Sequence, residues 1–428
     1  MKPSVHTVKV NFRGGIIPPD TLLHIVKAAR KALVARISFG LRQQLLMEIH
    51  TEDHPILMAS LDALGVRYET DTDRYPNIIS SYPAEDVFIG HTWLSETVYQ
   101  ELFEKMDDEA LLKINISNSN QSFTPFLTGN INWVAAEAEH FWHVFIRFPK
   151  TNTVYEWNRL VSTNDLPRMS RHIEQIILEH KNQFYDQPTA DGKTLFEMVQ
   201  TVDYTTQPAP GKAILPTFNL PYYEGFNRYN DQYWLGISRR DENFSFKLLH
   251  DIAQLCIDTK VQQLCCTPWK TMIIKGISEK DRTKWTRLLS NHLINTRHAA
   301  NELNFQVEDN SYDARLLKDK LVKYLNQKDI RTIGLCIGIK TKKKTEVFSS
   351  ILIKRRPFIQ LGVVELFFVY DILCAKDFNP NERTSTIFSS GIPKTLVPEH
   401  LRRAILAYYK QTSDVELDRQ QHSGAVMN

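Results

Sequence analysis

An internal repeat constrains the fold of this chain more than any other feature of its sequence. The first copy runs from Phe12 to Ile49 and contains a Gly14-Gly15 turn. Apolar residues at helical spacing predict a helix that begins near Asp20. The apolar run after Gln44 is short enough for a buried strand. The segment therefore predicts a strand, a tight turn, a helix and a second strand.

A more divergent copy lies in the second half of the chain. There, Leu248-Leu249-His250 matches Leu22-Leu23-His24, and residues 272–277 match residues 45–49. Self-similarity of this kind indicates that one structural unit occurs twice. We expect residues around 12–80 and 234–308 to form two copies of one α/β unit, related by an approximate two-fold axis.

Each copy is followed by a larger segment in which helical and strand patterns mix. The best boundary is the Pro/Gly-rich linker at residues 207–211. We therefore predict an α+β protein with four parts, at residues 1–83, 84–206, 207–310 and 311–428. In the larger parts we expect strands at 111–117, 131–136, 142–148, 331–339, 348–353 and 363–370, and helices at 93–106, 166–185, 313–326 and 398–410. In the second copy we expect a further helix at 285–303.

Composition excludes several classes of protein. The 428 residues are enough for a substantial core, and the net charge of +3 is too small to indicate a nucleic-acid or membrane partner. No apolar run approaches the roughly 20 residues of a membrane span. Residues 1–6 lack the apolar region of a secretory signal, so we expect a cytoplasmic location.

The five cysteines are scattered, with no Cys-x-x-Cys pair, so we expect neither a disulfide framework nor a zinc site. Cys265 and Cys266 lie in an apolar strand pattern and are expected to be buried core thiols. His140, His143, His172 and His180 lack the spacing of metal ligands, and we expect no metal site.

Four passages together resemble the sirohaem-dependent nitrite and sulfite reductase family. They are Gly14-Gly15-Ile16-Ile17, Arg42-Gln43 with Leu45-Leu46, Asn77-Ile78-Ile79-Ser80, and Lys113-Ile114-Asn115-Ile116 with residues 129–135. The resemblance covers the first half well and the second half in outline. It implies a nitrite/sulfite reductase-like fold, in which a ferredoxin-like half-domain and a larger catalytic-type α/β half occur in tandem duplication.

The family also holds a [4Fe–4S] cluster on four cysteines, which the resemblance would place between about residues 309 and 344. Only Cys336 lies there. One thiolate cannot hold a cluster that needs four ligands. We therefore expect the iron–sulfur cluster to have been lost.

The resemblance implies that cations bind the sirohaem carboxylates. Arg42 and Lys113 match family cations, whereas Ser38, Pro76 and Asn115 stand where the family has basic residues. In the second copy the family has the pattern Arg-x-Thr-x-x-Gln, whereas residues 265–270 of this chain read Cys-Cys-Thr-Pro-Trp-Lys. The candidate contacts to an anion or to sirohaem carboxylates in the interdomain cleft are Arg42, Lys113, Arg36 and Arg74, of which Arg42 is the principal one. Glu48 or Asp86 could instead neutralise these cations.

Three functions stay open: a relative that binds an anion or a tetrapyrrole-like ligand, an oxidoreductase fed by a partner electron carrier, and a structural or interaction protein. Sirohaem or haem stays open as a cofactor.

The basic patch formed by residues 340–344 and 354–356 could meet an acidic electron-carrier protein or form a solvated hairpin. The amides of residues 118–122, with Asn130 and Asn132, suit a ligand cleft or a set of hydrogen-bonded turns.

Overall fold

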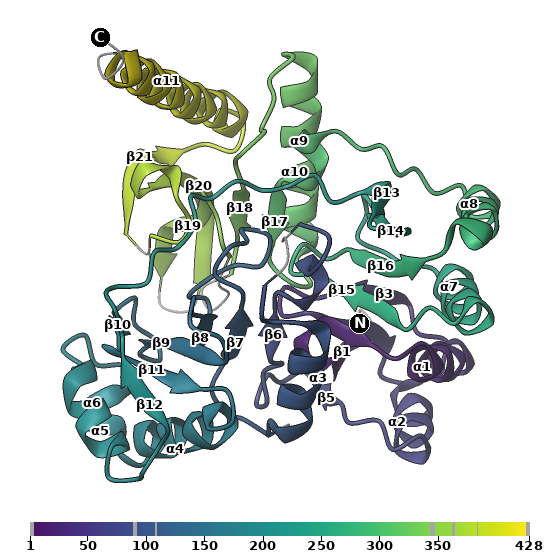
Figure 1. Cartoon of the computed structure of the whole chain (residues 1–428). Coiled ribbons are helices and arrows are strands. Elements are labelled where there is room, and N and C mark those ends of the chain that lie inside the picture. Colours follow the sequence, from purple (N-terminus) through teal and green to yellow (C-terminus); the bar gives the residue numbers. More distant parts are fainter. Residues whose placement is uncertain are drawn as a thin grey trace. The chain divides into compact units, whose positions relative to one another are not determined.

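The computed structural model describes residues 4–88, 92–107, 109–342, 347–361, 364–382 and 384–424. The chain divides into two compact units (Figure 1). Unit 1 comprises residues 1–217 and 221–298, and unit 2 comprises residues 218–220 and 299–428.

The first small sheet of unit 1 is built from the N-terminal copy of the repeat. Its elements are β1 (Val5–Asn11), α1 (Pro19–Lys31), β3 (Arg36–Phe39), β4 (Gln44–His50), α2 (His54–Ala63) and β5 (Glu69–Thr70). The strands lie in the order β3-β4-β1-β5, and β4 runs antiparallel to both β1 and β3. Helix α1 buries the apolar positions whose spacing predicts it, among them Leu22, Ile25 and Val26.

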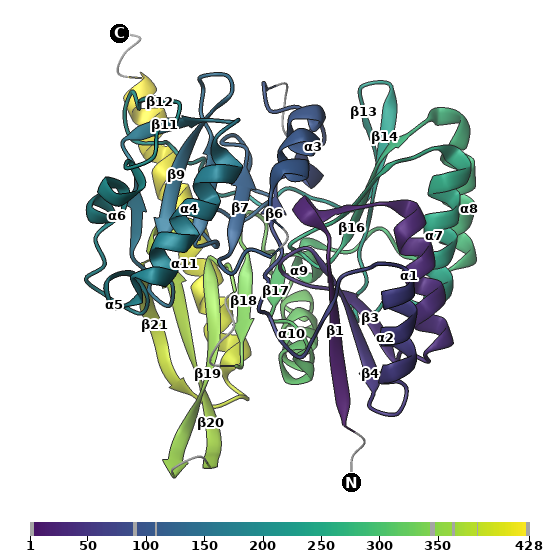
Figure 2. The same ribbon diagram turned by 90° about the horizontal axis from the view of Figure 1, so that it is seen from below.

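The second small sheet has the same connectivity. Its elements are β13 (Gly225–Tyr229), β14 (Gln232–Ile237), α7 (Phe246–Thr259), β15 (Gln263–Cys266), β16 (Met272–Ile277) and α8 (Arg282–Asn291), and β2 (Ile16–Ile17) joins it from the first copy. Strand β16 lies between β14 and β15 as β4 lies between β1 and β3. Helices α1 and α7 lie side by side over one shared hydrophobic core (Figures 1 and 2). The two segments thus share one topology, whereas the four domain boundaries stay predictions.

The larger sheet of unit 1 follows the first copy. Its strands are β6 (Ile79–Ser80), β7 (Ile114–Ser117), β8 (Ile131–Ala135), β9 (Phe141–Arg147), β10 (Val154–Glu156), β11 (Arg159–Ser162) and β12 (Thr206–Pro208). Its helices are α3 (Glu96–Lys105), α4 (Leu166–Glu179), α5 (Lys181–Phe184) and α6 (Gly192–Val199). Strands β6, β7 and β8 are parallel neighbours, and β9 returns antiparallel to β8.

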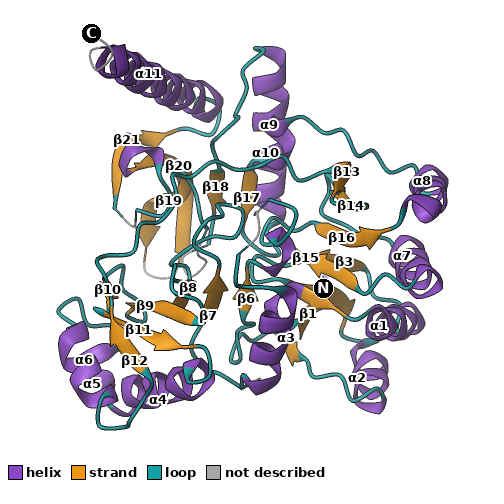
Figure 3. Cartoon of the chain, in the orientation of Figure 1, coloured by secondary structure: helices purple, strands orange, loops and turns teal. Residues whose placement is uncertain are grey.

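Unit 2 repeats this order of strands (Figure 3). Its buried apolar residues form a core of their own. It contains α9 (Ala300–Leu303), β17 (Phe305–Val307), α10 (Tyr312–Gln327), β18 (Ile337–Lys340), β19 (Ile351–Leu361), β20 (Val364–Ala375), β21 (Ser385–Ile392) and α11 (Val397–Gly424). Strands β17, β18 and β19 are parallel neighbours, and β20 and then β21 follow antiparallel. In the described part of the chain, no helix combines the length and the apolar character that a membrane crossing requires.

Several expected elements differ in extent. Within the copies expected at residues 12–80 and 234–308, the last strands pair outside the small sheets: β6 pairs with β7 of the larger sheet, and β17 pairs with β18. Strands of two or three residues carry too little alternation to indicate their partner. The expected helix 166–185 breaks at His180, whose backbone is not helical (φ −107°, ψ 48°), and the expected helix 285–303 is interrupted between α8 and α9. Lys343, Lys344 and Val363 lie outside the described residues.

Candidate functional site

Arg42 lies in the tight turn that joins β3 to β4. Its Nε and Nη2 atoms donate to the Asn77 carbonyl oxygen at 3.1 and 2.6 Å, and Nη2 also donates to the Ile114 carbonyl at 3.1 Å. The side chain of Asn115 lies 3.4 Å from both Nη atoms. The half-buried guanidinium therefore joins the first small sheet to the larger sheet and is held in one orientation.

Asn77 and Gln43, which flank Arg42 in space, are buried and hydrogen-bonded. Asn77 Nδ2 contacts the carbonyl oxygens of Phe12, Arg42 and Gln43 at 2.7–2.9 Å. Gln43 Nε2 donates to the carbonyls of Ser80 and Cys266, at 3.1 and 3.2 Å, and Gln43 Oε1 accepts from the Ser80 amide. These two amides connect the two small sheets to β6. Both residues lie in the sequence motifs, but no pattern in the sequence indicated a role for either.

The Gly-Gly opening is explained by the same packing. Gly14 has a positive φ of 63°, and a Cβ atom at this position would lie 2.3 Å from the Phe103 ring. The Gly14 amide donates to the Ile78 carbonyl at 2.8 Å. The motif is therefore required for the close approach of α3 to the turn.

Lys113 lies on the segment that Arg42 contacts. Lys113 directly precedes Ile114, whose carbonyl accepts from Arg42, and the Lys113 side chain is half-buried. The backbone of Lys113 is fixed by Asn130, whose Oδ1 accepts from the Lys113 amide at 3.1 Å. Arg42 and Lys113 thus lie on adjoining segments of unit 1.

Arg36 and Arg74 do not join this pair in the same way. Arg36 lies opposite Glu48, at the end of the β3–β4 ladder away from the turn, and its Nε is 3.9 Å from Glu48 Oε1. Arg74 is exposed and lies over the ring of Tyr75, 5.1 Å from its centroid. Glu48 therefore contacts Arg36 and is turned away from Arg42.

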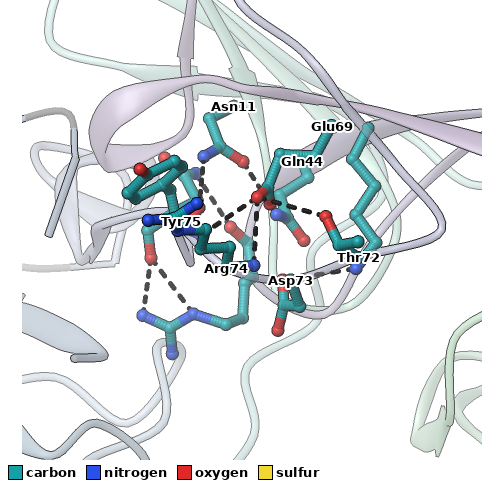
Figure 4. A network of polar contacts seen from close by, with 10 residues as sticks. Asn11, Gln44, Glu69, Thr72, Asp73, Arg74 and Tyr75 are labelled. Atoms are coloured by element: carbon teal, nitrogen blue, oxygen red, sulfur yellow. Dashed lines mark hydrogen bonds and ion pairs between the residues drawn. The ribbon is translucent and has the colours of Figure 1, made fainter. Parts of the chain in front are cut away.

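Arg74 belongs to a polar network in the loop that follows α2 (Figure 4). Glu69 Oε1 accepts from the amides of Arg74 and Tyr75, at 3.0 and 3.2 Å, while Asn11 Nδ2 donates to the Tyr75 carbonyl at 2.8 Å. The network borders a groove of about 1160 Å³ between α3 and the loop that follows α2. Neither Arg42 nor Lys113 is among the described residues that line this groove.

The amide-rich loop folds back on itself. Gln121 accepts from the Thr124 amide and donates to its carbonyl, and Asn132 makes the same pair of bonds with Gly129. Asn130 Nδ2 donates to the Arg147 carbonyl at 3.1 Å. These contacts support the interpretation as hydrogen-bonded turns.

The equivalent turn of the second copy has different chemistry. Thr267–Thr271 repeats the backbone hydrogen bonds of the Arg42 turn, and the φ angles of Gln43 and Lys270 are 56° and 58°. Trp269 therefore takes the place of Arg42, and its Nε1 donates to the Phe123 carbonyl at 2.8 Å. Lys270 takes the place of Gln43 and forms a buried ion pair with Glu242 at 3.2 Å. The position equivalent to Arg42 is thus aromatic.

A second buried charge lies between η2 (Tyr82–Ala84) and β16. Lys275 Nζ donates to the carbonyls of Tyr82 and Glu85, at 3.0 and 3.2 Å, and lies 4.1 Å from the centroid of the Tyr82 ring. Glu85 accepts from Asn118 and Thr92, at 3.4 and 3.5 Å. Burial raises the pKa of Glu85 to about 7, against the effects of the Asn118 bond and of Lys275.

The five cysteines are free and buried, and they lie in different places. Cys256 and Cys266 pack in the core shared by the small sheets, Cys265 packs in the core of the larger sheet, and Cys336 and Cys374 belong to unit 2. Burial raises the pKa of Cys265, Cys336 and Cys374 to about 12. The expectation that Cys265 and Cys266 are core thiols is confirmed. The described residues hold no group of three or more His, Cys, Asp or Glu side chains arranged to bind a metal.

Comparison with known proteins identifies a fold. No family model matches the sequence, and no curated protein matches it. Among solved structures, the chain is similar to the Mycobacterium tuberculosis NirA protein, with a TM-score of 0.70 and 13% identity over 94% of this chain and 80% of that chain. The α+β, nitrite/sulfite reductase-like fold class expected from the sequence is therefore confirmed at the level of the fold.

Proposed function

We propose that this protein has the nitrite/sulfite reductase-like fold without its iron–sulfur cluster, and that it binds an anion through Arg42 and Lys113. The observation that carries the proposal is the arrangement of these two cations on adjoining segments, with the Arg42 guanidinium held by the Asn77 and Ile114 carbonyls. Binding groups that are fixed beforehand lose less entropy when a ligand arrives. Fold similarity alone would not carry the proposal, because function belongs to the site.

The cysteines do not suit a [4Fe–4S] cluster, which needs four thiolates around one centre. Three of the five thiols pack in the cores of unit 1, and the other two are buried in unit 2. Burial also raises the pKa of Cys265 and Cys336 to about 12, and the thiolate is the form that binds a metal. We therefore assign no redox step to a cluster in this protein.

We expect the purified protein to contain neither non-haem iron nor acid-labile sulfide in stoichiometric amounts. The measurement is a chemical assay of both after anaerobic purification, together with the visible absorption spectrum. Near-stoichiometric iron and sulfide would contradict the proposal, because they would require a ligand set other than these five cysteines. A Soret band without sulfide would identify a tetrapyrrole as the anionic ligand.

The class of ligand follows from the two side chains. A guanidinium presents a planar set of donors that suits carboxylates and oxyanions, and an ammonium adds a point charge. Sulfite, nitrite, phosphate and the carboxylates of a tetrapyrrole all fit this description. The Glu48 contact with Arg36 supports the proposal, because it leaves that carboxylate on the far side of the hairpin from Arg42.

We expect one of these anions to raise the melting temperature, and Lys113→Met to abolish that rise. An anion at about 100 times its dissociation constant stabilises the folded state by about 2.7 kcal/mol, which is several degrees. Thermal-shift titrations with sulfite, nitrite, phosphate and haem measure this effect. Each variant is compared with its own ligand-free melting temperature, because Arg42→Ala also removes bonds to two carbonyls and so lowers stability by itself.

Arg74→Ala is the matched control, since Arg74 is an exposed cation of the same unit. We expect it to retain the full ligand-induced rise. The proposal is rejected if no anion shifts the melting temperature, or if the shift persists in both Lys113→Met and Arg42→Ala. A purely structural role for Arg42 would then account for its contacts.

A further inference from the structure

The second copy of the repeat does not supply the cations that a tetrapyrrole would require. The resemblance to the reductase family implies a ligand rimmed with carboxylates, which basic residues of both copies would bind. In the second copy, Cys265 stands where the family pattern begins with an arginine, and its side chain is fully buried. A buried thiol offers no charge-assisted hydrogen bond to a carboxylate.

The cation of the second turn, Lys270, is neutralised within the fold. Its Nζ lies 3.2 Å from Glu242 Oε2, and both side chains are almost completely buried. A buried charge that loses its partner is costly, so Lys270 is held by Glu242 and is not offered to an external carboxylate. The two equivalent turns therefore differ in charge, although their backbones are alike.

An aromatic cluster packs around the second turn. The ring centroid of Trp269 lies 6.1 Å from that of Tyr223, and the Phe123 ring lies 5.4 Å from Tyr223 and 5.0 Å from Phe88. The indole N–H of Trp269 donates to the Phe123 carbonyl. Because Trp269 is only 5% exposed, the position equivalent to Arg42 offers a ligand neither a charge nor an open ring face.

The first copy has also lost several of its basic positions. Ser38, Pro76 and Asn115 stand where the family has cations, and all three are buried. Arg42 and Lys113 keep their charge and lie on adjoining segments of unit 1. Two neighbouring cations suit one or two negative charges at a single centre, whereas carboxylates spread around a macrocycle would lack partners on its other sides.

We propose that this site takes one compact oxyanion, of the kind that phosphate and sulfite represent, and that it does not take the tetrapyrrole of the family. The inference rests on the proposed anion site at Arg42 and Lys113. A guanidinium binds two oxygens of one oxyanion with directed hydrogen bonds, and an ammonium adds a second charge. The buried neutral residues at the other matched positions provide no partner for further carboxylates.

Binding measurements on the wild-type protein test the proposal directly. Isothermal titration calorimetry is carried out with phosphate and sulfite, and absorbance titration with haem and with uroporphyrin, a tetrapyrrole rimmed with carboxylates. The ionic strength is held constant, because salt screens exposed charges. We expect one oxyanion to bind per chain, and we expect neither tetrapyrrole to show a saturable shift of its Soret band.

A charge variant locates the bound oxyanion. Lys113→Gln removes one of the two charges but keeps a polar side chain, so it should weaken oxyanion binding at least tenfold. Its melting temperature without ligand shows whether the variant is folded. Lys27→Gln is the matched control, since Lys27 is an exposed lysine of α1, and it should bind the oxyanion as the wild type does.

The possible results separate this inference from the proposed function. Saturable tetrapyrrole binding that phosphate displaces, or that Lys113→Gln weakens, would overturn the inference and leave the anion site in place. If neither an oxyanion nor a tetrapyrrole binds, the inference and the proposed function both fail. Oxyanion binding that Lys113→Gln leaves intact would place the oxyanion at another site and would also reject the inference.

Discussion

Replacement of Lys270 by methionine is expected to lower the free energy of unfolding by about 3–5 kcal/mol. Lys270 Nζ lies 3.2 Å from Glu242 Oε2, and the side chains are only 5% and 7% exposed. The substitution removes this ion pair from a buried carboxylate, and the cost of keeping that carboxylate desolvated dominates the effect. Urea denaturation at pH 7 measures the change, provided that the m-value is unaltered.

Two further variants distinguish this cause from a general loss of packing. Lys270→Met combined with Glu242→Gln removes both charges, so it should recover much of the lost stability. Lys150→Met removes the exposed pair with Asp186, in which both side chains are at least 60% exposed, and should cost less than about 1 kcal/mol. If the double variant is no more stable than Lys270→Met, the explanation by an uncompensated charge is wrong.

The stability of the protein should also fall as the pH rises from about 4.5 to 7, because of Glu85. Burial raises the pKa of this carboxyl from the ordinary 4.5 to about 7 in the folded state. Between these values the folded protein holds a proton that the unfolded chain has released. The folded state is therefore favoured below pH 4.5, and this advantage is lost progressively up to pH 7. One pKa unit corresponds to about 1.4 kcal/mol, so the loss is about 3 kcal/mol.

Glu85→Gln isolates this contribution, since the amide is neutral at every pH and can still bond to Asn118 and Thr92. The variant should be more stable than the wild type at pH 8 and should match it near pH 4.5. The difference between their unfolding free energies as a function of pH removes the titration of the histidines. Glu104→Gln, on the exposed face of α3, should leave the pH profile unchanged. If the free energies of unfolding of Glu85→Gln and the wild type instead differ by the same amount at every pH, the pKa of Glu85 is not raised by folding.

The internal repeat predicted the fold class because the apolar residues in its sequence are the residues that are buried in the structure. The apolar spacing of α1 and the short run that became β4 predicted buried faces, and both faces are buried in the structure. The same connectivity then recurs in α7, β15 and β16. Cys265 and Cys266 were predicted to be core residues for the same reason, since an apolar strand pattern reports burial directly.

The partners of the polar residues could not be obtained in this way. Arg42 was predicted as a candidate cation, but its contacts are with carbonyls 35 and 72 residues away, and every residue carries such a carbonyl. The buried pair of Lys270 and Glu242 was not predicted, because a charged residue in a sequence is ordinarily exposed. Gln43 and Asn77 gave no signal beyond their place in a motif.

The sequence alone thus determined the approximate place of most helices and longer strands, because periodicity depends on neighbours along the chain, although not where each element ends. Only the tertiary structure decided which sheet received β2, β6 and β17, since strands of two or three residues carry no partner preference of their own. It also decided which charges became buried. Those outcomes depend on contacts between segments that are far apart in the sequence. The periodicity of a single segment contains no information about such contacts.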